Sequence, residues 1–276
     1  MGMVAAASQA TLLFYDDFSS PAGSLLGTTP DAGTTWNYRT NNPAGDAYKV
    51  VTTGLTAPSG FKPATGGAAA KLADGNDSYS TYTGAPSYTA GNSIYYSFLF
   101  SSTQAVNTAS TSGRITAISA AYDSDYATIR YDKVLNDSFY KLSLVTRGLS
   151  TGVGCVQLTN QLALGSTHLI VVSYTYVTGN TNDMARVWLD PDSATFNAGT
   201  APAATLTVNG STSDLTKVFD SIRLGGQSGA PSKVKVDELR VGTTWADVTP
   251  IPEPATVGMI GLGAVITLLV RRMRTR

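Results

Sequence analysis

The stretch Ile94-Tyr95-Tyr96-Ser97-Phe98-Leu99-Phe100 decides the fold class of this chain. Successive side chains of an extended strand point to opposite faces, so Ile94, Tyr96, Phe98 and Phe100 share one apolar face. Alternation of aromatic and branched residues at this period is typical of a β-strand with one face against a core. The stretch therefore predicts a strong strand rather than a helix.

The same pattern predicts further strands along the chain. They are expected at Leu12–Phe18, Tyr48–Thr53, Arg114–Ala121, Ala127–Tyr131, Phe139–Thr146, Leu169–Val177, Met184–Asp190, Val218–Leu224 and Val234–Val241. Turn-forming residues such as those at 178–183 separate them at intervals that favour antiparallel hairpins. Most of residues 19–89 is rich in Gly, Pro, Asn and Ser, and is interpreted as long surface connections. The sequence thus predicts an all-β fold, a two-sheet antiparallel sandwich of jelly-roll topology.

Composition restricts the class of protein. Charged residues are only 14% of the chain, while 14 tyrosines and many small polar residues favour an exported β protein. Residues 11–249 suit one large β domain or two small ones, and we expect one. Four of the 19 Lys and Arg residues lie in the last six positions, so the body is mildly acidic and is not expected to bind nucleic acid.

The end of the chain has a different character from the body. Pro252, Glu253 and Pro254 precede the uncharged run Ala255–Val270, and an arginine-rich tail follows at 271–276. A helix over that run covers about 24 Å at about 1.5 Å per residue, which is short for a membrane span. Arginines that reach back toward the headgroups can close the gap. Because cationic flanks stay in the cytoplasm, the run predicts a short transmembrane helix with a cytoplasmic C-terminus. The alternative is a buried core helix.

These three parts in this order resemble the PEP-CTERM sorting signal of Gram-negative bacteria, here residues 250–276. The resemblance implies that the tail holds an exported protein in the inner membrane until an exosortase processes it near the Pro-Glu-Pro motif. The residues that it assigns to this role are Pro252, Glu253, Pro254, Arg271, Arg272 and Arg274. The mature protein would then reside in the outer envelope or the extracellular matrix.

Residues 1–10 (MGMVAAASQA) resemble the last part of a signal peptide, because Ser8-Gln9-Ala10 offers the small residues of a cleavage site. A cationic start and a full apolar region are missing. We expect the true start to lie upstream; the alternative is a plain N-terminal tail on a cytoplasmic protein.

A second resemblance covers most of the body. It rests on Tyr15-Asp16-Asp17-Phe18 with Gly23–Gly27, on His168–Tyr174 leading to Asn182-Asp183 and Val187–Pro191, and on Val236–Gly242 with Trp245. In this order they resemble laminin-G-like, concanavalin A-like modules of exported bacterial proteins. The resemblance implies a jelly roll with a binding or structural role, and sugars are common ligands of the family.

Catalytic groups are sparse. Glycoside hydrolysis needs two carboxylates that face one sugar, and the only glutamates are Glu238 and Glu253. Asp237 and Glu238 are adjacent in a strand and would face opposite sides, unless the change of apolar parity there marks a β-bulge. His168 is the only histidine, and Cys155 is expected to be a small buried residue. No catalytic residue is assigned; a hydrolase that uses aspartates is kept as an alternative.

Transition metals lack ligands, and no metal residue is assigned. Calcium is an open alternative, since three acidic turns could supply oxygens, although such turns usually cap the backbone instead. The turns are Asp74-Gly75-Asn76-Asp77, Asp123-Ser124-Asp125 and Asn180-Thr181-Asn182-Asp183.

Trp188 carries the sharpest binding hypothesis. Alternation places Arg186, Trp188 and Asp190 on the face opposite to Ala185, Val187 and Leu189. A tryptophan among charges on a sheet surface could stack on a sugar ring, or a loop or the second sheet could cover it.

The resulting hypothesis is an exported, non-enzymatic sandwich that binds carbohydrate, such as exopolysaccharide, or an envelope polymer. A secreted hydrolase and a purely structural matrix protein are the alternatives.

Overall fold

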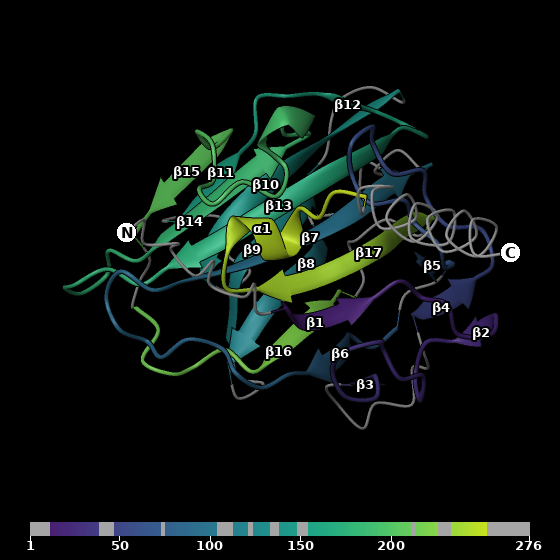
Figure 1. Cartoon of the computed structure of the whole chain (residues 1–276), viewed down its shortest axis with the longest axis horizontal. Coiled ribbons are helices and arrows are strands. Elements are labelled where there is room, and N and C mark those ends of the chain that lie inside the picture. The colour runs from purple at the N-terminus through teal and green to yellow at the C-terminus, as the bar shows by residue number, and fades with distance from the viewer. Residues whose placement is uncertain are drawn as a thin grey trace, which may run out of the picture.

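The computed structural model describes residues 12–38, 47–72, 75–103, 113–120, 124–132, 138–147, 154–210, 214–225 and 233–252. In these ranges the chain forms two packed antiparallel sheets, one α-helix of four residues and one short 3-10 helix (Figure 1). The prediction of an all-β, two-sheet antiparallel sandwich is confirmed. The predicted helix at 255–270, the arginine tail and the signal remnant at 1–10 lie outside the described residues.

The larger sheet contains the strand that decided the fold class. Its order is β15 (Leu206–Asn209), β14 (Met184–Leu189), β13 (Thr167–Thr175), β7 (Ser93–Ser102), β17 (Val234–Gly242), β5 (Ala68–Lys71), β4 (Tyr48–Val51) and β2 (Gly23–Ser24), and β1 (Leu12–Asp16) also pairs with β17. The last long strand, β17, therefore lies between β7 and β5, at the middle of this sheet. The sheet is complete only when the C-terminal part of the body is in place.

The smaller sheet has the order β11 (Cys155–Gln157), β10 (Phe139–Arg147), β9 (Ser124–Asp132), β8 (Gly113–Ala120), β16 (Ser221–Leu224), β6 (Ser78–Thr81) and β3 (Asn37–Tyr38), with β12 (Leu162–Ala163) on β10. All its pairs are antiparallel. Side chains from both sheets form the main core, and Ile94, Tyr96, Phe98 and Phe100 belong to it as predicted.

A second, smaller core covers the outer face of the larger sheet. Helix α1 (Trp245–Val248), the segment 55–64 and the segment after the 3-10 helix η1 (Ser193–Thr195) lie over β7, β13 and β14. Figure 1 shows α1 in front of this sheet. Leu99 and Trp188 are among the buried residues of this outer core. The strand at the centre of the prediction is therefore buried on both faces along part of its length.

Helix α1 is fixed at both ends. Thr244 and Asp247 form a capping box, in which each side chain accepts the backbone N–H of the other residue. At its C-terminal end, the carbonyl of Val248 accepts a hydrogen bond of 2.6 Å from the hydroxyl of Ser97 on β7. This helix is too short for apolar spacing of 3.6 residues to be visible, and the sequence did not predict it.

The long strands match the predicted segments, with ends that differ by a few residues. Residues 19–89, interpreted as mostly connections, also contain β5 and β6, and this part of the prediction was wrong. Ala68, Ala69 and Ala70 of β5 are all buried, so no alternation of polar and apolar residues marks this strand. Within the described ranges, neither helix is long or apolar enough to cross a membrane.

Candidate functional site

An acidic segment begins where β1 ends. The carboxylate of Asp16 accepts hydrogen bonds from the backbone N–H of Phe18 and the indole N–H of Trp36, both at 2.7 Å. Phe18 has a φ of 54°, and the Asp16 side chain stabilises this turn because it satisfies the N–H there. Burial of Asp16 raises its pKa to about 6.

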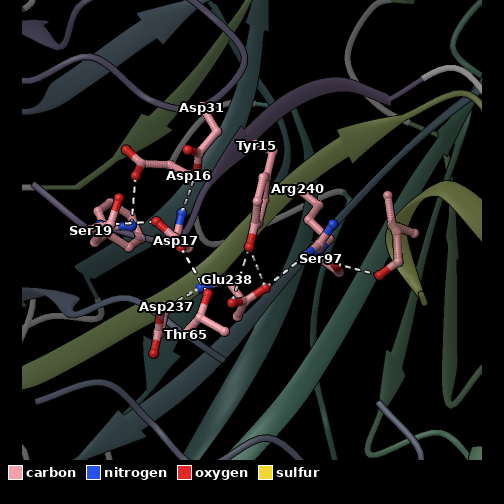
Figure 2. Close-up of polar contacts among 12 residues, drawn as sticks. Tyr15, Asp16, Asp17, Ser19, Asp31, Thr65, Ser97, Asp237, Glu238 and Arg240 are labelled. Carbon is pink, nitrogen blue, oxygen red and sulfur yellow. Dashed lines mark hydrogen bonds and ion pairs between the residues drawn. The ribbon is translucent and has the colours of Figure 1, made fainter. Parts of the chain in front are cut away.

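Two further aspartates lie beside Asp16. Asp17 is 8% exposed, and its carboxylate accepts hydrogen bonds from the N–H of Ser19 and the hydroxyl of Thr65. Asp31 comes from the next loop and accepts the N–H of Asp17 at 3.4 Å. One carboxylate oxygen from each of the three aspartates lies within 4.8 Å of the others (Figure 2). Nothing in the sequence pointed to Asp31 or Thr65.

Strand β17 has a bulge at its acidic pair. The register with β7 shifts between Asp237 and Arg240, and Glu238 has a φ of 50°. The predicted β-bulge is thus confirmed. Since Val236 and Leu239 both belong to the main core, Asp237 and Glu238 both point away from that core.

Glu238 has its own partners. It is fully buried, lies 2.7 Å from the guanidinium of Arg240, and accepts hydrogen bonds of 3.1 and 3.2 Å from the Tyr15 hydroxyl (Figure 2). Arg240 lies 3.9 Å from the centre of the Tyr15 ring. This trio is electrically balanced and joins β1 to β17.

Asp237 is placed differently. Its carboxylate accepts the backbone N–H of Leu55 and that of Glu238, both at 2.7 Å, and it is fully buried. Burial raises the pKa of Asp237 to about 7. A Cβ at Gly54 would lie 2.9 Å from Asp237 Oδ2 and 2.9 and 3.0 Å from the carbonyl oxygens of Gly67 and Gly66. Oxygens of three residues thus converge beside Gly54.

Asp17 connects the two groups of oxygens. A Cβ at Gly66 would lie only 1.9 Å from the carbonyl oxygen of Asp17, so the two backbones are in direct contact. Asp17 also contributes to the raised pKa of Asp237. Among the described residues, no ion pair joins Asp16, Asp17, Asp31 or Asp237 to a lysine or arginine.

Such an arrangement needs protons or a cation to balance its charge. Calcium prefers about six to eight oxygens from carboxylates and backbone carbonyls, which are the groups present here. These donor types suit calcium, and we expect the group beside Gly54, the Asp237 carboxylate with the carbonyls of Gly66 and Gly67, to hold it. A bound ion would then join β17 to the segment 54–67.

We expect a pH-dependent effect of calcium on stability. The folded-state pKa values of Asp16 and Asp237, about 6 and 7, exceed the ordinary aspartate pKa of 3.8. The stability that protonation contributes is present below about pH 4 and is lost as the pH rises through 6 and 7. Without calcium the unfolding midpoint should therefore fall between pH 5 and pH 8. Calcium should raise the midpoint again at pH 8. At a calcium concentration of 100 times Kd, the free energy of unfolding should increase by about 2.7 kcal/mol.

The measurement is thermal unfolding at both pH values, in calcium and in EDTA. Asp237→Asn should remove the calcium effect, whereas Asp192→Asn, at an exposed position, should retain it. Equal midpoints in calcium and EDTA at pH 8 would rule out the cation site.

The three acidic turns proposed for calcium have other roles where they are described. Asp74 and Asp123 lie outside the described residues. Asp77 and Asp125 are buried in ion pairs with Arg114, and Asp125 also pairs with Arg223. The Asp183 carboxylate accepts hydrogen bonds from the N–H groups of Val177 and Leu215 and the Tyr174 hydroxyl. The Asp183 carboxylate thus caps backbone N–H groups, which is the usual role of such turns and the alternative to calcium binding.

Trp188 is covered rather than exposed. Its side chain is 3% exposed, its indole N–H donates to the carbonyl of Pro202 at 3.0 Å, and its ring lies 5.1 Å from that of Trp245. The open-surface interpretation is wrong here, because residues 196–204 and helix α1 close over the ring. Arg186 donates a hydrogen bond to the hydroxyl of Thr175, and the Asp190 carboxylate contacts His168 beyond the other end of β14. Arg186, Trp188 and Asp190 therefore do not form one surface site.

His168 and Cys155 have structural surroundings. His168 lies near the start of β13, as predicted, and its Nδ1 lies 2.6 Å from the Asp190 carboxylate. Cys155 is only half-buried, because β11 is at the edge of the smaller sheet, so the prediction of a buried residue was wrong. Burial still raises the pKa of its thiol.

Several solved structures resemble the chain at low sequence identity. An endo-β-1,4-glucuronan lyase from the fungus Trichoderma reesei has a TM-score of 0.47 and 16% identity, over 88% of this chain and 100% of its own. The CBM2 module of the evolved Dit protein of Lactobacillus casei BL23 phage J-1 has a TM-score of 0.39 and 11% identity, over 86% of this chain and 97% of its own. The potassium-bound Emp46p carbohydrate recognition domain has a TM-score of 0.40 and 8% identity, over 85% of this chain and 99% of its own. Likenesses at these TM-scores assign neither activity nor ligand.

No curated protein matches the chain significantly. The family model that matches is described as the PEP-CTERM protein-sorting motif, and it covers residues 250–274. This match agrees with the resemblance carried by Pro252, Glu253, Pro254 and the arginines. The chain is therefore a β-sandwich that ends in a PEP-CTERM protein-sorting motif.

Proposed function

We propose that this is an exported, non-enzymatic protein, held in the inner membrane by its tail until an exosortase processes it near Pro252-Glu253-Pro254. The observation that carries the proposal is the sorting motif at 250–274, which begins where the sandwich ends. In this proposal residues 1–10 are the remnant of a signal peptide, and 11–249 are one jelly-roll domain of the concanavalin A-like class. The mature domain resides in the outer envelope or matrix and binds carbohydrate or an envelope polymer.

The folded domain holds the chain up to the motif. The carbonyl of Thr249 accepts the N–H of Asn197 at 2.8 Å, and that of Pro250 accepts the N–H of Lys62 at 2.9 Å. Ile251 and Pro252, which follow, are exposed. The sorting motif therefore begins at residues that the folded domain still holds.

The arrangement of carboxylates supports a non-enzymatic role. A glycosidase needs two carboxyl groups that can reach one sugar. Asp237 and Glu238 are both fully buried, and each accepts hydrogen bonds within the protein. They are better explained by the cation site and by the contact between β1 and β17 than by catalysis.

We expect the sorting motif to control processing. Replacement of Pro252, Glu253 and Pro254 by alanine should leave the whole tail on the exported protein, because the exosortase no longer recognises it. Replacement of Arg271, Arg272 and Arg274 by glutamine should release the chain from the membrane, because the cationic flank that stops it is gone. Mass spectrometry of the protein from a Gram-negative host with an exosortase measures both.

Asp192→Asn, an exposed change in the folded domain, is the control and should be processed normally. A parent protein that keeps its full tail in that host would contradict the proposal.

A further inference from the structure

A hollow of about 390 Å³ opens on the outer face of the larger sheet, on the side of the outer core. Three segments that are far apart in the sequence line it: Pro86 and residues 91–93 with Tyr95 of β7, the loop at 199–201, and residues 243–245 at the start of α1. Ligand pockets are typically about 300–1,000 Å³, so a small ligand would fit. The cation site described above lies at other residues.

The aromatic wall of the hollow is held in place from behind. Tyr95 lines the hollow, and its ring packs against that of Trp188 with 6.1 Å between centroids and a tilt of 32°. Trp188 in turn packs against Trp245, whose indole N–H donates to the carbonyl of Thr195 at 2.7 Å. Because both indole N–H groups are engaged inside the protein, Tyr95 is the aromatic residue whose polar group is left for a ligand.

The hydroxyl of Tyr95 has no hydrogen-bond partner within the described part of the chain, and neither does that of Thr200, which also lines the hollow. Beside them, Ser93 bonds to Thr175 at 2.8 Å, and Thr175 accepts from Arg186 at 3.1 Å. Ser173, the cross-strand neighbour of Tyr95, is buried, and its hydroxyl also lacks a hydrogen-bond partner.

The chemistry of the lining restricts the ligand. The side chains that line the hollow are uncharged and combine hydroxyl groups with small apolar surfaces and aromatic rings. A charged ligand would lose hydration without gaining an opposite charge from the lining. The Arg186 guanidinium acts on Tyr95 from outside the lining and already donates to Thr175, so a neutral ligand is favoured. A sugar ring has an apolar face for the ring of Tyr95 and hydroxyls for its polar neighbours.

We propose that this hollow binds a neutral sugar residue of a glycan, with Tyr95 and Thr200 as its polar contacts. The proposal rests on the carbohydrate-binding part of the proposed function and names its site. Trp188 then supports Tyr95 from behind and does not touch the sugar. The site lies on the outer face of the larger sheet, between residues 91–93 and helix α1.

The test is isothermal titration of the full-length protein with neutral tetrasaccharides of glucose, xylose, mannose and galactose, and with tetragalacturonate as a charged counterpart. Gly199→Leu fills the hollow: a Cβ there meets nothing within 4 Å, and the backbone conformation is an ordinary one, so the fold should tolerate it. Tyr95→Ala removes the ring. Tyr88→Ala, at a tyrosine that is 56% exposed and outside the hollow, is the matched control.

We expect at least one neutral tetrasaccharide to bind, Gly199→Leu and Tyr95→Ala to weaken it about tenfold or more, and Tyr88→Ala to leave it unchanged. Thermal unfolding of each variant shows that the fold is retained.

Unchanged binding by both hollow variants would overturn the site and leave carbohydrate binding intact. Binding of tetragalacturonate alone would overturn the neutral ligand class. A protein that binds none of the sugars would overturn both this site and the carbohydrate-binding part of the proposed function, whereas sorting would be unaffected.

Discussion

Asp125→Asn is expected to destabilise the sandwich by about 3–5 kcal/mol, because it leaves two buried guanidinium groups without their shared carboxylate. Asp125 lies 2.5 Å from both Arg114 and Arg223, and the side chains of all three are at most 4% exposed. Arg114 keeps a second contact with Asp77 at 3.2 Å, but Arg223 loses the ion pair with Asp125. These residues join β8, β9 and β16 in the smaller sheet.

The matched control is Asp190→Asn. Asp190 also makes a short contact with a basic side chain, 2.6 Å to His168, but its side chain is 48% exposed. Pairs exposed to solvent contribute about 0–1 kcal/mol, so this change should have little effect. Urea unfolding of the three proteins compares them. Equal midpoints for Asp125→Asn and Asp190→Asn would show that the buried network contributes no more than an exposed pair.

Gly66→Ala is expected to be the second severe change. A Cβ at this position would lie 1.9 Å from the carbonyl oxygen of Asp17 and 2.7 Å from its carbonyl carbon. Both atoms belong to the backbone and cannot turn aside, so the segment 65–67 or the end of β1 must move. Insertion of a methyl group into packed structure costs about 1–3 kcal/mol and sometimes more, and we expect about 3 kcal/mol here.

This change should also weaken calcium binding, because it displaces the carbonyl oxygens beside Asp237. Gly199→Ala is the control, since a Cβ there meets nothing within 4 Å. Urea unfolding in EDTA measures the loss of stability, and calcium titration measures the effect on the ion. A Gly66→Ala protein as stable as Gly199→Ala would contradict the close backbone contact.

The long strands could be predicted because each carries its own signal. Ile94, Tyr96, Phe98 and Phe100 face the main core, and the bulge at Asp237 and Glu238 was visible in the apolar parity of β17. Strand β5 carries no such signal, since alanines fill both of its faces. Its place is decided by β4 and β17, which pair with it on either side.

The surroundings of Trp188 could not be predicted in the same way. Alternation correctly placed its side chain on the face opposite to Val187 of the main core. Whether that face is open depends on segments that are distant in the sequence, here Phe61, Phe196 and Trp245. Local periodicity describes which side a residue faces but not what lies on that side.

The sequence by itself determined the all-β class, most long strands and the sorting motif at 250–274, because these depend on the order and period of neighbouring residues. Only the tertiary structure decided which carboxylates gather with Asp17, which loop covers Trp188 and where a hollow opens beside Tyr95. Asp31 and Thr65 reach Asp17 from separate loops, and β17, the last strand, brings Asp237 beside the segment 54–67. Contacts between residues so far apart follow from sheet topology, which no local pattern records.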